Sequence, residues 1–426
     1  NHFLFQDPNY KIRQQEGAEV QDLRANLSYL WVPGNMTETL LLRGSLYWAD
    51  KNVPGPLNSQ NPGNQQDLFA NASVHYQRKE IGARKASLDG IVNYFYEGMD
   101  WEDALGKSTH NLHTVQAIHR WEIPVSEKVL LRPSLDGTLA YLDSSDLGIK
   151  SRQDGGIALG LEYFPIGKVG ILPYLKVIIT DTTVFPIPKL GILWYVSEEV
   201  TVKNNWFRTF RLPTLNDLYW PEDSFAKGNQ DLKPEDGVGA DFIVEWKKPE
   251  AFRLDTSFYI TYQKDAITWQ PASGGKWMPV NLAKALYFGS DTRIVTDFHP
   301  SLKLTASYGW LLTYVLTGDL SIKDDKRMPY QPMHRLGLGV EVLWNTGSLV
   351  FSAKYESERY ATIVNAAPLA PYFTLNVSLI QKLGKPWTLL LSGTNLLGAN
   401  FQLIETYPLP RTLFSVGLKY THEVGQ

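Results

Sequence analysis

Hydrophobic and polar residues alternate with a period of two along almost the whole chain. In residues 22–31 one face of the predicted strand is apolar and ends in aromatic side chains. Leu27 and Trp31 lie on this face, whereas the opposite face is mostly polar. The same alternation returns in residues 68–77 and 157–163. Because a period of two places successive side chains on opposite faces of an extended strand, the pattern predicts β-strands throughout, without runs of helical period.

The predicted strands are joined by short and long connections in alternation. The short connections lie at residues 33–35, 124–127, 165–168, 197–199, 248–250, 299–301, 345–347 and 384–386. The long connections run through about residues 50–66, 97–110, 143–154, 209–235, 268–277, 316–332, 359–371 and 397–410. Barrels of the bacterial outer membrane have short periplasmic turns and longer extracellular loops, whereas a soluble sandwich has no reason to sort its loops in this way.

The two faces of the predicted strands separate a membrane barrel from a soluble β-sandwich, which also alternates. Tyr and Trp recur at the ends of the apolar stripes, as an aromatic girdle requires, and polar faces recur on many strands, as a wet or plugged lumen permits. The assignment places Leu27, Val74 and Leu159 toward lipid, and Arg24, Asn71 and Glu162 toward the lumen. We therefore expect an all-β fold, a transmembrane antiparallel β-barrel with about 19 strands from residue 22 onward.

Composition supports this class and excludes others. Aromatic residues make up 12% of the 426 residues, with 13 Trp, 22 Tyr and 18 Phe, although hydrophobic residues reach only 43%. The absence of cysteine excludes a disulfide scaffold, a thiolate zinc site and a cysteine nucleophile. The 41 basic and 44 acidic side chains give a net charge of −3 without long basic runs, so nucleic acid is not an expected partner. No apolar stretch approaches about 18 residues, so no transmembrane helix is predicted.

The sequence contains none of the common motifs of catalysis or metal binding. The 8 histidines do not cluster at metal-ligand spacing, and H-E-x-x-H, G-x-S-x-G and P-loop motifs do not occur. His110 and His113 lie beside a predicted long loop, where they could reach an iron or haem ligand, although solvated loop histidines are commoner. We therefore expect no catalytic residue, no metal site and no bound cofactor.

One segment is not typical of a generic barrel. Residues 207–220 read FRTFRLPTLNDLYW, and residues 228–235 read GNQDLKPE. The segment resembles the FRAPTLNELY…GNPDLKPE signature of TonB-dependent outer-membrane transporters, with Leu212 in place of the usual Ala and Gln230 in place of the usual Pro. The residues that carry the match include Arg211, Pro213, Asn229, Leu232, Pro234 and Glu235.

Four further pieces follow in the order found in this family. Residues 281–285 resemble its N-x-x-K-A element and residues 332–336 its P-x-H-R-L element. Residues 395–398 and 407–411 resemble its NLFD…YPxPxR closing segment. The resemblance implies a plugged barrel of about 22 strands. Because barrel-like sequence fills residues 1–426, we expect the N-terminal plug and about three strands to lie outside them, in preceding polypeptide or in a second chain.

The resemblance also implies a function. It implies a receptor in the bacterial outer membrane, in contact with the lipid bilayer and lipopolysaccharide. Such a receptor binds a ferric siderophore, haem or a corrinoid such as vitamin B12. It imports this ligand when the TonB–ExbB–ExbD complex pulls on the plug. Haem is disfavoured because residues 212–228 contain no histidine. The candidate ligand contacts are aromatic residues in or beside predicted long loops: Trp101, Tyr219, Trp220, Trp269 and Trp277.

Two other functions are compatible with a barrel of this kind. A passive porin would be favoured by an inward constriction loop, and the signature at residues 207–235 counts against it. An outer-membrane barrel enzyme would be favoured by an acid–base pair at the rim, and no motif in the sequence supports one.

Overall fold

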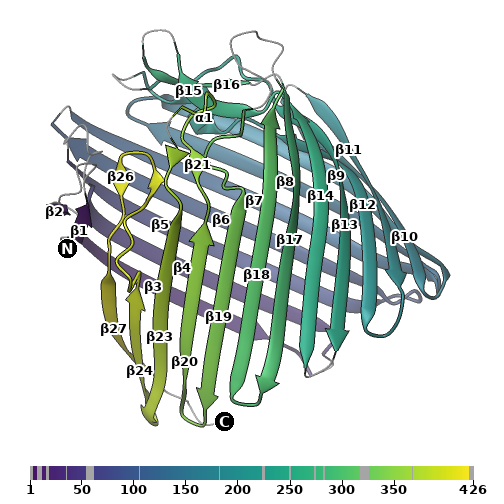
Figure 1. Cartoon of the computed structure of the whole chain (residues 1–426). Helices are drawn as coiled ribbons and strands as arrows, with labels where there is room; N and C mark the ends of the chain where they lie inside the picture. Colours follow the sequence, from purple (N-terminus) through teal and green to yellow (C-terminus); the bar gives the residue numbers. More distant parts are fainter. Residues whose placement is uncertain are drawn as a thin grey trace.

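The barrel is seen in a computed structural model. It describes residues 3–6, 12–15, 19–34, 36–53, 62–104, 106–181, 183–222, 226–248, 251–272, 275–281, 284–316, 326–366 and 368–421. Within these residues, 19 strands form one antiparallel sheet that curls into a barrel (Figure 1). Residues 282–283 of the N-x-x-K-A element, and much of the predicted loop at 316–332, fall outside the described residues.

The barrel wall follows the chain order. Its strands are β3 (Val20–Trp31), β4 (Glu38–Val53), β5 (Gly63–Ile81), β6 (Ala86–Asp103), β7 (Gly106–Ser126), β8 (Val129–Ser144), β9 (Gly148–Ile166), β10 (Val169–Thr180), β11 (Val184–Tyr195), β12 (Val200–Arg211), β13 (Glu235–Lys248), β14 (Phe252–Lys264), β17 (Lys284–His299), β18 (Leu302–Val315), β19 (His334–Trp344), β20 (Gly347–Glu356), β23 (Tyr372–Gly384), β24 (Trp387–Thr394) and β27 (Leu413–Tyr420). The count of 19 confirms the expected architecture.

Short elements accompany the wall. They are the paired strands β1 (Phe3–Gln6) and β2 (Ile12–Gln15), β15 (Ile267–Pro271) and β16 (Trp277–Asn281), β21 (Arg359–Tyr360) and β22 (Pro368–Leu369), β25 (Gln402–Ile404) and β26 (Tyr407–Pro408), with the helix α1 (Leu215–Tyr219). Figure 1 shows α1, β15 and β16 together at one rim of the barrel. No helix in the described part of the chain is long and apolar enough to cross a membrane.

The register of the strands sorts apolar and polar side chains onto opposite faces of the wall. Val74 on β5 lies directly opposite Leu42 and Val92 of the neighbouring strands. The preceding residue, Ser73, lies opposite Arg43. Because side chains alternate along a strand, a slip of one residue would turn each apolar stripe toward the lumen, so burial of the two faces fixes the register.

Exposed aromatic side chains mark the strand ends that lead to the short turns. They are Trp31, Tyr163, Trp194, Trp246, Trp344, Trp387 and Tyr420. Three of these rings form two edge-to-face pairs, with a centroid distance of 5.2 Å for Trp246 and Phe252 and 4.9 Å for Trp387 and Tyr420. Aromatic rings with polar tips are favoured at a membrane–water interface, so this row has the composition of the girdle of an outer-membrane barrel.

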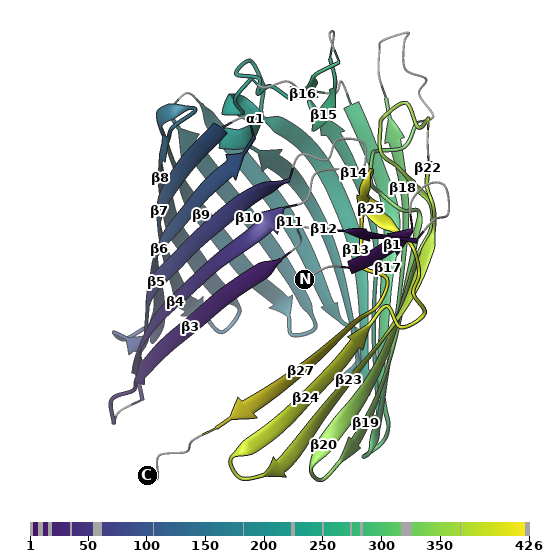
Figure 2. The same cartoon turned by 90° about the vertical axis from the view of Figure 1, so that its left-hand side faces the viewer.

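β3 and β27, the first and last strands of the wall, are neighbours in the strand order of the barrel, and the position between them is named here the seam. Registered backbone partners join each wall strand to the next from β3 onward, but none joins β27 to β3 among the described residues. Figure 2 shows these two strands well apart, and all 12 residues of β3 are exposed. Since every registered pair is antiparallel and the wall has 19 strands, β3 and β27 run in the same direction.

Some predicted loops are strands in the structure. The predictions of long loops at 97–110 and 143–154 are wrong, because β6 and β7 extend to Asp103 and Gly106, and β8 and β9 extend to Ser144 and Gly148. Each pair is closed by a tight turn: Asp103 Oδ1 accepts a hydrogen bond from the Gly106 N–H, and Gly148 has a φ of 64°. The ends of these strands extend beyond the apolar band and carry polar residues. In sequence, such strand ends resemble loops, which explains why the loops were predicted too long.

Candidate functional site

The segment that resembles the transporter signature begins with a capped helix. Thr214 precedes α1, and its Oγ1 accepts a hydrogen bond from the Asp217 N–H at 3.0 Å. In return the Thr214 N–H donates to Asp217 Oδ2 at 2.9 Å. This capping box satisfies the first backbone donors of the helix and explains one helical turn where only strands and loops were expected.

Asp217 also joins this helix to the β15–β16 hairpin. The residue is only 7% exposed, and Oδ1 accepts a hydrogen bond from the Trp269 Nε1–H at 3.1 Å. Trp269 in turn packs edge to face on Trp220, with ring centroids 6.1 Å apart. Arg211 Nη1 lies 3.6 Å from Asp217 Oδ2 and provides the opposite charge. A buried carboxylate with these partners fixes the helix on the hairpin.

A second buried carboxylate closes the base of the loop. Glu235, 8% exposed, accepts two hydrogen bonds from the Arg211 guanidinium, at 2.6 and 2.7 Å. Glu235 Oε1 also accepts from the Ile267 N–H, at 2.7 Å, where β15 begins. Arg211 and Glu235 end β12 and begin β13, so the bidentate pair holds together the two strands from which the loop rises.

Asn229 fixes the return of the loop. Its Nδ2 donates to the Pro279 carbonyl oxygen at 3.0 Å, and its backbone N–H donates to the Asp217 carbonyl oxygen at 2.8 Å. Gly228 is needed beside it, because a Cβ at this position would lie 2.5 Å from the Trp220 backbone nitrogen. Leu232 is buried, and Pro213 and Pro234 flank the segment. The signature residues thus build a frame, named here the loop frame, from the described residues 211–222 and 226–235 and from the hairpin strands β15 and β16.

The loop frame leans on the rim of β9. Lys150 Nζ lies 5.0 Å from the centre of the Tyr219 ring, and Arg152 Nη1 donates a hydrogen bond to the Pro213 carbonyl oxygen at 3.1 Å. Pro213 is 61 residues from Arg152 in sequence. The loop frame begins between β12 and β13 and contacts β9, so it extends over the ends of the strands that lie between them, at one rim of the barrel (Figure 1).

The structure brings together four of the five candidate aromatic residues. Trp220 and Trp269 are in contact, and Tyr219, the last residue of α1, precedes Trp220, which caps the helix. The Trp277 carbonyl oxygen accepts a hydrogen bond from the Lys227 N–H of the loop, at 2.9 Å. Trp101 lies apart on β6, where its ring covers Gly63 so closely that a Cβ there would lie 2.3 Å away. Trp101 is therefore a wall residue, and its placement in a long loop was wrong.

His110 and His113 do not converge on one ligand. They are three residues apart on β7 and therefore point to opposite faces of the strand. His110 Nδ1 lies 2.8 Å from Ser144 Oγ, whereas His113 Nδ1 lies 2.8 Å from the Tyr94 hydroxyl. Within the described residues, no group of three or more His, Asp or Glu side chains is arranged to hold a metal ion.

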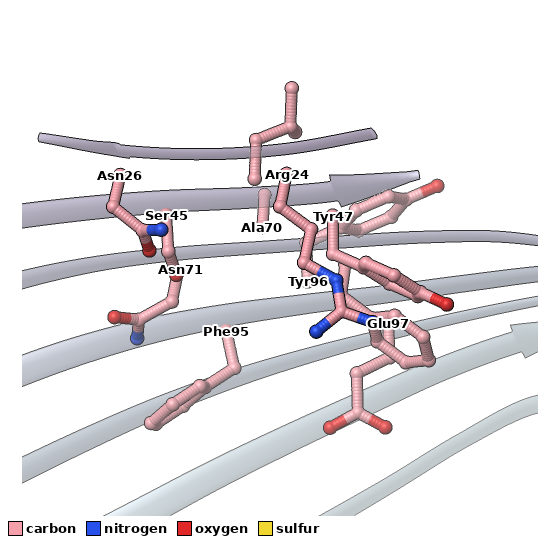
Figure 3. Close-up of a pocket in the computed structure, with 11 residues that line it drawn as sticks. Arg24, Asn26, Ser45, Tyr47, Ala70, Asn71, Phe95, Tyr96 and Glu97 are labelled. Carbon is pink, nitrogen blue, oxygen red and sulfur yellow. The ribbon is translucent and has the colours of Figure 1, made fainter. Parts of the chain in front are cut away.

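The lumen wall near the seam carries a cavity of about 450 Å³ that the sequence interpretation missed. Arg24, Tyr47, Phe69 and Glu97 lie directly opposite one another on β3 to β6. The Tyr47 and Phe69 rings stack at 5.8 Å, and the Arg24 guanidinium lies 5.0 Å from the Tyr47 ring centre. Figure 3 shows Arg24 and Asn71 extending from the same side of the strands, in accordance with the predicted lumen face. Phe69 on an otherwise polar face was the available signal.

Comparison with known proteins gives one family and a consistent fold. Residues 9–396 match the family described as TonB dependent receptor-like, beta-barrel. The vitamin B12 transporter BtuB of Vibrio vulnificus is 38% identical over 77 residues, 18% of this chain and 12% of that protein. BtuB of Photobacterium profundum is 27% identical over 194 residues, 43% of this chain and 29% of that protein. The matches therefore span less than a third of these relatives.

Solved structures resemble the whole wall. The copper transporter OprC superposes with a TM-score of 0.75 at 12% identity, over 95% of this chain and 72% of OprC. The FrpB iron transporter from Neisseria meningitidis (F3-3 variant) gives 0.76 at 13% identity, over 94% of this chain and 72% of FrpB. At such identities the likeness is one of fold, and these proteins are transporters rather than enzymes.

Proposed function

The chain belongs to the TonB-dependent receptor β-barrel family, and from this premise we propose that it is the wall of an active outer-membrane transporter for a scarce, large nutrient. The family match over residues 9–396 carries the proposal. The loop frame, built from the signature residues at the mouth, supports it. Among ferric siderophore, haem and corrinoid, a corrinoid is the first candidate, because both curated relatives are vitamin B12 transporters.

We propose that further strands and a plug complete this wall from outside residues 1–426. Direct closure would pair β3 with β27 in parallel, unlike every registered pair in the wall. An odd number of added strands keeps all pairs antiparallel, and three would give the 22 of plugged transporters, starting from the 19 present. The TonB–ExbB–ExbD complex would act on the plug, as in other members of the family.

The proposed ligand surface is the part of the loop frame that remains open. Trp220 is 41% exposed, and Tyr219 lies next to it. The Trp269 indole is held by Asp217, and the Trp277 backbone is bonded to the loop, so we assign these two residues to positioning the surface. Trp101 is far from the frame in the wall and remains a weaker candidate contact.

Energised uptake tests this function. Cells that express the receptor are given radiolabelled vitamin B12, with radiolabelled ferric enterobactin as the second probe. An active transporter accumulates one probe only with TonB and a proton gradient, whereas a passive porin is indifferent to both. Uptake of neither probe, or uptake unchanged without TonB, would overturn the proposal.

Replacing Tyr219 and Trp220 with Ala tests the proposed ligand surface. The double variant should bind the imported probe more weakly by about 1 kcal/mol or more, mostly through faster release. A Trp220→Phe variant keeps an aromatic ring and is the matched control. Unchanged affinity of the double variant would remove these residues from the site.

A further inference from the structure

The inner wall from β7 to β12 contains a second cavity, of about 620 Å³, in line with the loop frame. Lys150 contacts Tyr219 of the frame at the rim of β9, and Gly160 lines the cavity. These two positions on β9 are an even number of residues apart and share one face, separated by roughly 33 Å along the strand. The cavity therefore lies on the same face of β9 as the contact with the loop frame, further along the strand.

The floor of the cavity is a row of residues that lie directly opposite one another on four strands. The row consists of Arg132, Gly160, Tyr174 and Lys189 on β8, β9, β10 and β11. Tyr174 Cδ2 lies 3.3 Å from the place of a Cβ on Gly160, so the ring covers the glycine. The result is a flat aromatic floor with a cationic side chain at each end.

Charged side chains surround this floor. Four cationic side chains and two carboxylates line the cavity. Arg132 pairs with two carboxylates, those of Glu122 and Glu162, at 3.0 and 2.5 Å, and Lys203 pairs outside the cavity with Glu245 at 2.7 Å. Arg120 has a single longer contact, at 3.9 Å from Asp89.

Lys189 is the cation that remains. Among the residues that the structure describes, its ammonium group has no hydrogen-bond or ion-pair partner, and its side chain is exposed in the cavity. An ammonium group beside a phenol ring offers hydrogen-bond donors to an anionic oxygen. A volume of about 620 Å³ is that of a small-molecule site.

We propose that this cavity is a lumenal subsite that takes an anionic oxygen group of the nutrient, such as a phosphate diester, carboxylate or catecholate, during passage. Lys189 provides the charge and the Tyr174 ring provides the surface. The subsite rests on the proposed transport function and deepens it, because it requires a nutrient that carries such a group.

The test compares surface binding with uptake in the intact receptor. A Lys189→Gln variant should bind radiolabelled vitamin B12 and ferric enterobactin at the surface as the wild type does. Its energised uptake of the imported probe should fall roughly two- to fivefold, the value of one exposed charge contact. Lys189→Arg should restore uptake. A larger loss for ferric enterobactin would identify the highly charged chelate as the source of the anion, and a loss for vitamin B12 would identify its phosphate.

Lys303→Gln is the matched control, because Lys303 is a lysine on another part of the inner wall, on β18. Wild-type uptake by Lys189→Gln would overturn the subsite, as would an equal loss in the control. Increased sensitivity of Lys189→Gln cells to a large antibiotic such as vancomycin would also overturn it, since the lysine would then hold the plug. Absence of uptake by the wild type would refute the transport function instead.

Discussion

At the scale of single residues, two buried carboxylates explain most of the loop frame. Asp217 serves the cap of α1 and the indole of Trp269, and Glu235 joins Arg211 to the start of β15. The alternation of apolar and polar residues predicts toward which face of the barrel wall, lipid or lumen, a side chain points. It gives no sign that Asp217 contacts a tryptophan 52 residues away, because such contacts depend on the fold of the loops and not on local periodicity.

Removing the Asp217 carboxylate should loosen the loop frame. Asp217→Ala leaves the Thr214 N–H and the Trp269 indole N–H without their acceptor, which costs about 1–3 kcal/mol locally. Hydrogen exchange of α1 and β15 should become faster while the wall strands keep their protection. Asp217→Asn, which retains one acceptor oxygen, should have a smaller effect. Wild-type exchange in the Ala variant would show that the carboxylate does not hold the frame.

Neighbouring residues on β5 provide a test of the two faces. Val74→Arg places a charge on the apolar face and should destabilise the inserted barrel by roughly 2–4 kcal/mol if it lies near the membrane midplane. Ser73→Arg places the same side chain in the wet lumen and should be tolerated. The readout is the heat-resistant folded fraction on semi-native gels of outer membranes. Equal tolerance of the two variants would contradict the assignment of the faces.

At the scale of elements, the sequence predicts the number of wall strands better than their lengths. The apolar stripes and the short turns mark each strand where it crosses the membrane. β6 to β9 continue beyond this band with polar residues such as Glu102 and Lys107, whose 2.6 Å ion pair lies near the turn. Because nothing in the polarity of these residues separates a projecting strand from a loop, the predicted loops were too long.

The loop frame should depend on pH through Glu222, which bridges Lys276 at 2.9 Å and Lys227 at 3.1 Å. Its hydrogen bonds with Lys276 and Lys227 lower the pKa of Glu222 below its ordinary value of 4.5. The bridge therefore stabilises the loop frame at pH values above 4.5, the ordinary pKa of a glutamate. This stabilisation is lost as the pH falls through the lowered pKa of Glu222.

Amide exchange at residues 226–228 and 276–281, corrected for intrinsic rates, should rise as the pH is lowered through the depressed pKa of Glu222, below its ordinary value of 4.5. Glu222→Gln should show the faster exchange already at neutral pH. Equal corrected exchange in Glu222→Gln and in the wild type at neutral pH would show that the bridge does not hold the hairpin.

At the scale of the whole molecule, the odd number of strands in the wall connects structure to function. A plugged transporter needs a wall of antiparallel neighbours that closes around its plug. A wall of 19 strands that closed on itself would instead be a channel with one parallel pair. The strand number was predictable from alternation. That further strands lie between β27 and β3 was an expectation from the odd count and the family resemblance. The position of β3 relative to β27 was not predictable, because alternation carries no information on contacts between strands nearly 400 residues apart.

The most direct test of this account is a disulfide cross-link across the seam, in the full receptor in its outer membrane. The 426 residues contain no cysteine, so the two cysteines of an Asn26→Cys, Ser415→Cys variant would be the only thiols within them. Ser392→Cys with Ser415→Cys is the positive control, because these two residues lie directly opposite on β24 and β27. Neighbouring strands place opposite Cβ atoms about 5 Å apart, whereas three intervening strands separate them by roughly 19 Å. The account predicts an efficient disulfide in the control and none across the seam. A disulfide between positions 26 and 415 as efficient as the control would show that the 19 strands close on themselves, and would contradict it.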